Sequence, residues 1–185
     1  MTREELRGAL REHAYLEGDF VLRSGRRSKY YLDKYRFETR PELLGPLGEL
    51  IAAEAAEHAA DATLLAAPEL GAVALAAAAS LVSGLPFLIV RKAAKEYGTS
   101  NRIEGAFSAG ERVCVVEDVV TSGGALLDSV QTLRNAGLRV GTAVCVVDRE
   151  EGGAKALSRE SVALCPIFRA SELLETAKTA AKPHG

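Results

Sequence analysis

The sequence predicts a single α/β domain in which a twisted, mostly parallel sheet is flanked by helices. Several short runs of Val, Leu and Ile are continuous rather than alternating with polar residues, which is typical of strands buried on both faces. Segments with helical periodicity separate these runs, and this alternation favours a parallel sheet. A length of 185 residues suits one domain and is short for two.

The first 40 residues are expected to form a helix followed by a hairpin. Apolar residues recur at helical spacing among charged ones, at Leu6, Leu10 and Ala14. This spacing predicts an amphipathic helix that ends near Gly18. The stretch FVLRSGRRSKYYLDK, residues 20–34, places apolar and aromatic runs on either side of a Ser-Gly turn, and it predicts two short strands.

Residues 41–176 are assigned to the α/β core, and residues 177–185 to a frayed tail. Pro41 suits the first turn of a helix that is expected to reach about His58. Further helices are expected at 71–83, 124–135 and 153–160, with a last turn or two at 170–177. Strands are expected at 62–71, 86–90, 112–118, 140–148 and 162–168.

Composition indicates that any anion-binding site is a local feature. The chain has 23 basic and 25 acidic residues and a formal charge of −2, so its overall field favours no nucleic-acid or membrane partner. Three cysteines lie apart within apolar runs, where a thiol behaves as a small hydrophobe: Cys114, Cys145 and Cys165. No signal-peptide pattern and no bilayer-spanning apolar run is visible, and we expect a cytoplasmic protein.

The stretch VCVVEDVVTSGGA, residues 113–125, is the most informative part of the chain. A buried strand ends on Glu117 and Asp118, and small residues follow before a helix. Ligands of open α/β sheets bind outside the carboxyl ends of the strands, and helix N-termini bind anions. Carboxylates repel phosphate, so the acids would face hydroxyls or a metal instead. A sugar phosphate satisfies both the turn and the acids, because its phosphate would lie on the turn and its ring hydroxyls would face the carboxylates.

This stretch resembles the phosphoribosyl-diphosphate signature of the type I phosphoribosyltransferases, in which an acidic pair lies between apolar residues and a hydroxyl-rich loop. The resemblance implies one phosphoribosyltransferase domain over residues 1–185, with the hairpin as a hood. It also implies catalytic roles for Glu117 and Asp118, which would fix the ribose hydroxyls. Expected phosphoribosyl-diphosphate contacts here are Glu117, Asp118, Val119, Val120, Thr121, Ser122, Gly123, Gly124 and Ala125. A capped strand end without a ligand is the simpler alternative.

Three further stretches are similar to orotate phosphoribosyltransferases: residues 20–34, the loop RKAAKEYGTSNRIEG at 91–105, and VVDREEGG at 146–153. The implied reaction transfers the phosphoribosyl group of 5-phosphoribosyl 1-diphosphate to orotate, giving orotidine 5′-monophosphate and diphosphate in pyrimidine (UMP) biosynthesis. The resemblance also implies Mg²⁺ as the cofactor. The ion would be bound mainly through the substrate, and no protein side chain is assigned as a metal ligand.

The loop carries several cations, and its composition suits a lid that becomes ordered over a ligand. A solvated surface loop would carry the same cations. The resemblance implies that Lys95 is catalytic and that the loop closes over the neighbouring subunit of a homodimer. Further phosphoribosyl-diphosphate contacts are then Arg91, Lys92, Lys95 and Tyr97 of the loop and Arg23 of the hairpin.

The expected contacts of orotate are Thr121, Arg149, Tyr31 and Leu32, with Tyr30 in the same hood. The guanidinium of Arg149 suits a planar carboxylate through two parallel hydrogen bonds. Asp148 and Glu150 could instead hold Arg149 in a surface ion pair. Simple packing is the alternative role for the aromatic residues.

The chain departs from the orotate phosphoribosyltransferase pattern at three positions. Tyr97 replaces a common histidine, Leu70 a common lysine and Arg23 another common lysine. Without a lysine at position 70, we expect Mg²⁺ and the loop to supply the positive charge that a diphosphate requires. Two alternatives stay open: a phosphoribosyltransferase for a purine or another base, and a regulator that senses phosphoribosyl diphosphate without catalysis.

Overall fold

A six-stranded sheet forms the centre of the computed structural model, which describes residues 1–21, 25, 27–93 and 102–179. The strand order is β5-β4-β3-β6-β7-β8, and every strand is parallel to its neighbours except β5, which is antiparallel to β4. The strands are β3 (Leu64–Pro68), β4 (Phe87–Val90), β5 (Ile103–Glu104), β6 (Arg112–Val120), β7 (Arg139–Asp148) and β8 (Ala163–Arg169). The predicted α/β class with a mostly parallel sheet is confirmed.

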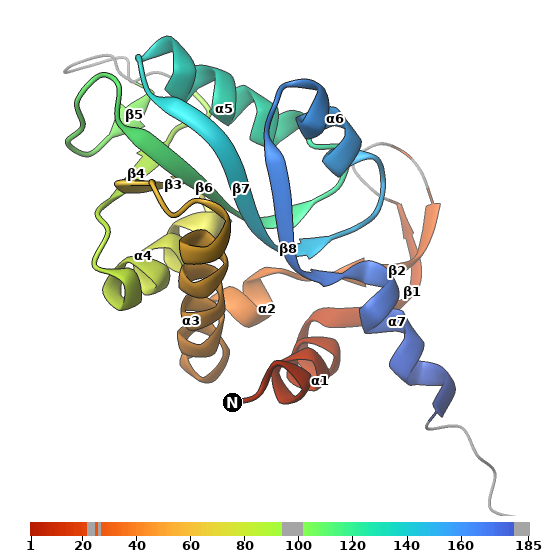
Figure 1. The fold of residues 1–185 in the computed structure, drawn as a ribbon. Coiled ribbons are helices and arrows are strands. Elements are labelled where there is room, and N and C mark those ends of the chain that lie inside the picture. The colour runs from red at the N-terminus through yellow and green to blue at the C-terminus, as the bar shows by residue number, and fades with distance from the viewer. Residues whose placement is uncertain (22–24, 26, 94–101, 180–185) are drawn as a thin grey trace, which may run out of the picture.

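Helices cover both faces of this sheet (Figure 1). One face carries α3 (Pro41–His58) and α4 (Gly71–Ser83), and the other carries α5 (Gly124–Asn135) and α6 (Gly153–Arg159). Coverage on both faces explains why the strands read as continuous apolar runs. In the described part of the chain, no helix combines the length and the apolar character that a membrane span needs.

The side chains of β6 divide between two hydrophobic cores. Cys114 packs with α3 and α4, whereas Val115 packs in the core that includes α5 and α6. Because successive side chains of a strand point to opposite faces, this alternation extends to the acidic pair at the end of the strand. It places Asp118 beside Gly71 at the start of α4, and Glu117 on the opposite side.

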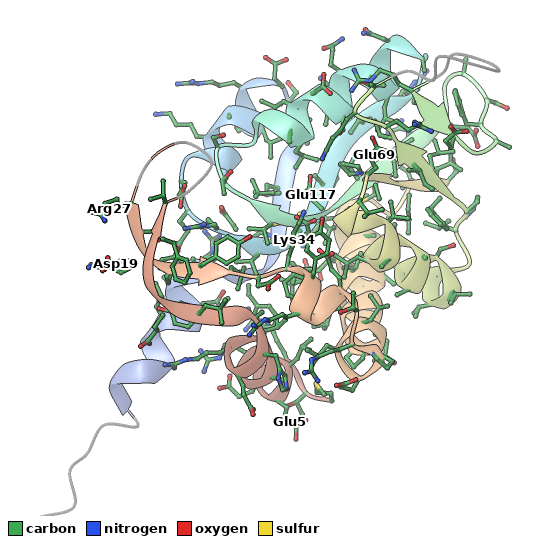
Figure 2. The ribbon with its side chains drawn as sticks, turned by 180° about the vertical axis from the view of Figure 1, so that it is seen from behind. Glu5, Asp19, Arg27, Lys34, Glu69 and Glu117 are labelled. Atoms are coloured by element: carbon green, nitrogen blue, oxygen red, sulfur yellow. The ribbon has the colours of Figure 1, made fainter. Side chains whose placement is uncertain are left out.

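The N-terminal elements form a hairpin and two helices outside the main sheet. They are α1 (Arg3–Ala14), β1 (Tyr15–Val21), β2 (Arg27–Leu32) and α2 (Tyr35–Glu38), and α7 (Ala170–Thr179) lies against α1. In Figure 2 the hairpin residues Asp19 and Arg27 lie at the edge of the molecule. Lys34, directly after β2, lies centrally next to Glu117. The hairpin therefore leads the chain back to the end of β6.

The first helix ends earlier than its periodicity predicts. It stops at Ala14 rather than near Gly18, because Tyr15 already pairs with Leu32 in the hairpin. Strand pairing of aromatic and apolar side chains overrides the helical pattern here. The short helix α2 and the two-residue strand β5 were not predicted, since neither is long enough to show a period.

The chain reverses its direction of travel across the sheet at β3. It passes from β3 through α4 to β4 on one side, and later places β6 on the other side of β3. In doubly wound sheets a crevice forms outside the carboxyl ends of the strands at such a switch point. A ligand site is therefore expected between the ends of β3 and β6.

Candidate active site

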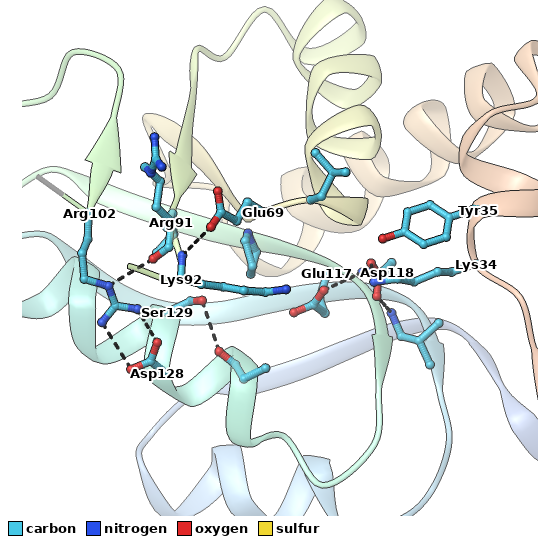
Figure 3. A pocket seen from close by; sticks show the side chains of 15 residues that line it. Lys34, Tyr35, Glu69, Arg91, Lys92, Arg102, Glu117, Asp118, Asp128 and Ser129 are labelled. Carbon is cyan, nitrogen blue, oxygen red and sulfur yellow. Dashed lines mark hydrogen bonds and ion pairs between the residues drawn. The ribbon is translucent and has the colours of Figure 1, made fainter. Parts of the chain in front are cut away.

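A pocket of about 240 Å³ occupies this switch point (Figure 3). It is bounded by the ends of β3, β4 and β6 and by the residues that begin α2. Its charged lining residues are Lys34, Glu69, Arg91, Lys92, Arg102, Glu117, Asp118 and Asp128. Cations and carboxylates therefore face the same space, as a ligand with both phosphate and hydroxyl groups requires.

A second pocket, of about 200 Å³, adjoins the first, and the two share Glu117, Val119 and Ala125. Its walls are formed by residues 119–126, which include the turn before α5. The cap residue of α5, Gly123, has a φ of 83° and makes no side-chain capping bond, and the first turn holds no acidic residue. The first N–H groups of α5 therefore have no side-chain cap and no acidic residue in their own turn, and such a helix start suits a phosphate group.

Two glycines bring the turn before α5, residues 121–123, against the start of α6. This turn is called the phosphate turn below. A Cβ atom on Gly153 would lie 2.4 Å from Cγ1 of Val120 and 2.7 Å from the carbonyl oxygen of Thr121. A Cβ atom on Gly123 would lie 3.2 Å from Cα of Gly153. No side chain fits between the two segments, so the turn is supported directly by the backbone that follows β7.

Replacing Gly153 with alanine is expected to lower the free energy of unfolding by about 1–3 kcal/mol, the usual cost of overpacking. Chemical denaturation measures this change. Gly8 in α1 is the matched control, because a Cβ atom there would have nothing within 4 Å. Gly8→Ala is expected to stabilise the protein by up to about 1 kcal/mol, since alanine favours helix. An unchanged denaturation midpoint for Gly153→Ala would contradict the close contact.

Both members of the acidic pair are buried and line the first pocket, and Glu117 also lines the second. Glu117 is 8% exposed and Asp118 is 3% exposed. Burial, followed by the charge of Asp118, raises the pKa of Glu117 to about 8. Oε1 of Glu117 accepts the N–H of Asp118 at 3.0 Å. Oδ1 of Asp118 accepts the N–H of Val119 at 2.6 Å, and its Oδ2 accepts Nζ of Lys34 at 2.5 Å.

Sequence reasoning missed Lys34 as a site residue. It is half-buried and forms an ion pair with Asp118, which lies 84 positions further along the chain. No local pattern reports a contact at that separation. The available signal was its place directly after a hairpin that was expected to cover the site.

The two ends of the predicted catalytic loop meet beside the pocket. The N–H of Arg91 donates to the carbonyl oxygen of Arg102 at 2.7 Å, and the N–H of Lys92 donates to Oε1 of Glu69 at 2.8 Å. Arg102 also pairs with Asp128 of α5. The start of the loop is therefore bound to β3, and its end to α5. Three predicted site residues lie outside the described residues: Arg23, Lys95 and Tyr97.

Arg149 follows β7 and lies next to the phosphate turn. Its N–H donates to the carbonyl oxygen of Val120 at 2.9 Å, and the residue is 9% exposed. The surface ion pair considered from the sequence is wrong, because the guanidinium is buried and its partner is Glu151, at 3.1 Å. The sequence suggested Asp148 and Glu150, which adjoin Arg149, because it does not show the turn after β7. This turn brings Glu151 back to Arg149.

The hood residues differ in what they contact. Tyr30 stacks on Tyr15 at 5.4 Å between ring centres, and the guanidinium carbon of Arg149 lies 4.8 Å from the centre of the Tyr30 ring. Tyr31 is 42% exposed, whereas Leu32 is buried in the core with residues of α1. Tyr31 and Leu32 are not among the described residues that line the two pockets. Tyr30 is the hood residue in contact with Arg149.

Known proteins are similar to this chain in sequence and in fold. Residues 42–168 match the family model described as the phosphoribosyl transferase domain, and the chain therefore belongs to the phosphoribosyl transferase family. The orotate phosphoribosyltransferase of Methanocella arvoryzae is 52% identical over 157 residues, which cover 85% of this chain and 88% of that protein. Within the family, the chain belongs to the orotate phosphoribosyltransferases, which are enzymes.

Solved structures agree with this membership. The Mycobacterium tuberculosis H37Rv orotate phosphoribosyltransferase in complex with Fe(III) dicitrate matches with a TM-score of 0.83 and 31% identity, over 93% of this chain and 98% of that one. A structure of the same enzyme in complex with 5-phospho-α-D-ribosyl 1-diphosphate matches with a TM-score of 0.78 and 29% identity, over 92% and 98%. The predicted family and its hairpin are confirmed.

Proposed function

We propose that this chain transfers the phosphoribosyl group of 5-phosphoribosyl 1-diphosphate to orotate and releases diphosphate. The observation that carries the proposal is that both acids line the first pocket and that Glu117 also lines the adjoining pocket formed by the turn before α5. The turn before α5 would hold the 5′-phosphate, and the ribose hydroxyls would face Glu117 and Asp118. The diphosphate would then extend toward Arg91 and Lys92 at the end of β4.

The chemistry requires positive charge to be stabilised on the ribose. The bond from the anomeric carbon to the diphosphate oxygen breaks, and a ring nitrogen of orotate forms the new bond to that carbon while its own proton leaves to solvent. The carboxylate of Asp118 favours the cation-like ribosyl centre, because a fixed anion in a buried site acts strongly on developing charge. By resemblance, Lys95 meets the negative charge on the departing diphosphate, and closure of the loop would exclude water.

Mg²⁺ is the expected cofactor of this reaction and would neutralise charge on the diphosphate when bound. In the described ranges, no three or more His, Cys, Asp and Glu side chains group to hold a metal ion. The carboxyl groups of Glu117 and Asp118 each also accept a hydrogen bond from a backbone N–H group. We infer that the ion is held by phosphate and ribose oxygens, which suits a cation that keeps several waters.

Arg149 is proposed to bind the carboxylate of orotate. Its Nε atom is buried and has no hydrogen-bond partner among the described residues, so it can donate to an arriving acceptor. The backbone hydrogen bond between Arg149 and Val120 holds the backbone of Arg149 next to the phosphate turn, and its guanidinium lies over the ring of Tyr30. The base would then lie between the phosphate turn and Tyr30 of the hood.

Arg149→Lys is expected to raise the KM for orotate about 10- to 100-fold, the effect of losing one charged hydrogen bond. The KM for 5-phosphoribosyl 1-diphosphate should change little, and initial rates with each substrate varied measure both. Arg112→Lys is the matched control, since Arg112 pairs with Asp61 in the exposed region at the start of β6. An unchanged KM for orotate would show that Arg149 does not bind orotate.

The proposed reaction is tested by diphosphate release from 5-phosphoribosyl 1-diphosphate and Mg²⁺ in the presence of orotate, uracil, adenine or hypoxanthine. Orotate should give the highest rate, and a reaction without base gives the background. A higher rate with a purine would favour the purine alternative. Binding of 5-phosphoribosyl 1-diphosphate without product from any base would favour a regulator.

We also propose that the active form is a homodimer in which the loop around Lys95 completes the site of the neighbouring subunit. The resemblance to orotate phosphoribosyltransferases supports this arrangement. It makes the pocket in one chain incomplete without the other chain, which a subunit-mixing experiment can test.

A further inference from the structure

Three charged side chains converge on Gly71, at the start of α4. A Cβ atom on Gly71 would lie 2.2 Å from Oδ2 of Asp118, 2.8 Å from Oε1 of Glu38 and 2.9 Å from Nζ of Lys34. The three atoms come from β6, from α2 and from the residue before α2. The absence of a side chain at position 71 is what lets them meet.

Glu38 is an unusual member of this group because it is a buried carboxyl beside a second carboxyl, that of Asp118. It is 4% exposed, and its Oε1 atom has no hydrogen-bond partner among the described residues. The nearby cation, Lys34, already donates to Oδ2 of Asp118 at 2.5 Å. Burying an unpaired carboxylate beside a second carboxylate is costly. A proton held by Glu38 and shared with Asp118 removes both costs.

The protonation of these groups agrees with this arrangement. Burial, followed by the charge of Asp118, raises the pKa of Glu38 to about 8. Burial lowers the pKa of Lys34, but the hydrogen bond and charge of Asp118 outweigh it, and the net shift is upward. Near neutral pH, Glu38 therefore keeps its proton and Lys34 keeps its charge.

The helix α2, which carries Glu38, is packed by α1, α3 and α4, and two further acids act on this group. Asp33 precedes α2, and its charge raises the pKa of Glu38 further. Glu117 lies on β6, on the far side of Asp118, and its charge acts on Lys34. The helix α4, which packs on α2, has no titratable side chain between Gly71 and Ser83. The group around Gly71 therefore has Lys34 as its nearest cation.

We infer that Glu38 is a positioning residue whose carboxyl group donates a hydrogen bond to Oδ2 of Asp118 and, with Lys34, holds Asp118 as a single fixed anion. Glu38 is not part of the pocket wall and acts through Asp118. The role of the fixed anion rests on the proposed function, in which Asp118 faces the ribose. An anionic substrate then meets one carboxylate in this group rather than two.

Infrared spectroscopy of the full chain without ligand tests where the proton lies. The carbonyl stretch of a protonated carboxylic acid should be present at neutral pH and should fade as the pH rises through about 8. Glu117, whose pKa is also raised to about 8, contributes to the same titration. Glu38→Gln should therefore reduce the titrating band to the share of Glu117, because the amide donates to Asp118 but cannot ionise. An identical titrating band in Glu38→Gln overturns the inference, since another carboxyl would then hold the proton. This measurement needs no substrate, so its failure is separate from failure of the proposed reaction.

Kinetics test the positioning role. Glu38→Gln should stay close to wild type in kcat, and Glu38→Ala should lower kcat/KM for 5-phosphoribosyl 1-diphosphate roughly tenfold, with the KM for orotate unchanged. Wild-type kcat/KM should fall above pH 8, where Glu38 ionises, and this fall should be smaller in Glu38→Gln. Glu42→Gln is the matched control, as an exposed carboxylate in the first turn of α3.

Two kinetic outcomes overturn the inference. One is a Glu38→Gln variant that folds and loses activity as Glu38→Ala does, because the proton donor would then be irrelevant. The other is a Glu38→Gln variant whose pH profile matches that of wild type. The second comparison remains decisive even where Glu38→Ala does not fold.

Discussion

Asp118→Asn is expected to lower kcat/KM for 5-phosphoribosyl 1-diphosphate about 100- to 1,000-fold, the range found when one fixed electrostatic contact to a transition state is lost. Asparagine has nearly the same size, so the change removes a charge from a buried position without leaving a cavity. The positive charge on the ribose would lose its nearest fixed anion, and Lys34 would lose its partner. Steady-state rates at saturating orotate measure the effect.

Asp61→Asn is the matched control for this change. Asp61 is an exposed carboxylate that pairs with Arg112 at the opposite end of β6 from the acidic pair. Its replacement should leave turnover unchanged. Near-normal turnover in Asp118→Asn, with the fold intact by circular dichroism, would show that the charge of Asp118 plays no part in the reaction.

Lys95→Ala is expected to lower kcat about 100- to 1,000-fold while the affinity for orotate is retained. By resemblance, Lys95 meets the charge that develops on the diphosphate as it departs, so its contribution arises in the transition state and not in base binding. Rates and calorimetric titration with orotate separate the two. Lys155→Ala on the exposed side of α6 is the control. Equal turnover in the Lys95 variant would exclude it from the chemistry.

Mixed dimers decide whether Lys95 acts across the subunit interface. In a heterodimer of Lys95→Ala and Asp118→Asn subunits, action across the interface leaves one site with both side chains intact. Activity should then reappear on mixing two nearly inactive proteins. Verified heterodimers that stay inactive would show that each chain uses its own Lys95.

Much of the fold and the centre of the site could be predicted from local patterns. Buried strands of continuous Val, Leu and Ile predict the sheet, and the acidic pair followed by small residues predicts a strand end, a turn and a helix start. These features depend on neighbours in the sequence. The structure places the turn at the start of α5 as expected, whereas β6 continues two residues past the acidic pair, to Val120.

Contacts between distant segments could not be predicted in this way. The pairing of Lys34 with Asp118 and the burial of Glu38 depend on how the hairpin returns to the sheet, and no periodicity reports this. The packing of the Leu32 side chain in the core was also not predicted, because alternation in β2 does not reveal which face α1 covers. Mg²⁺, the homodimer, the cytoplasmic location and the roles of individual site residues stay predictions.

The backbone contact between Gly153 and the phosphate turn links two parts of the active site that chemists would wish to change separately. The segment after β7 carries Arg149, which is proposed to bind the base, and the same segment supports the turn proposed to bind the sugar phosphate. Efforts to engineer a new nucleobase preference by enlarging this segment would push the ribose-phosphate anchor out of place. Altering Tyr30 or its neighbours in the hood offers a route to new bases that leaves the anchor untouched.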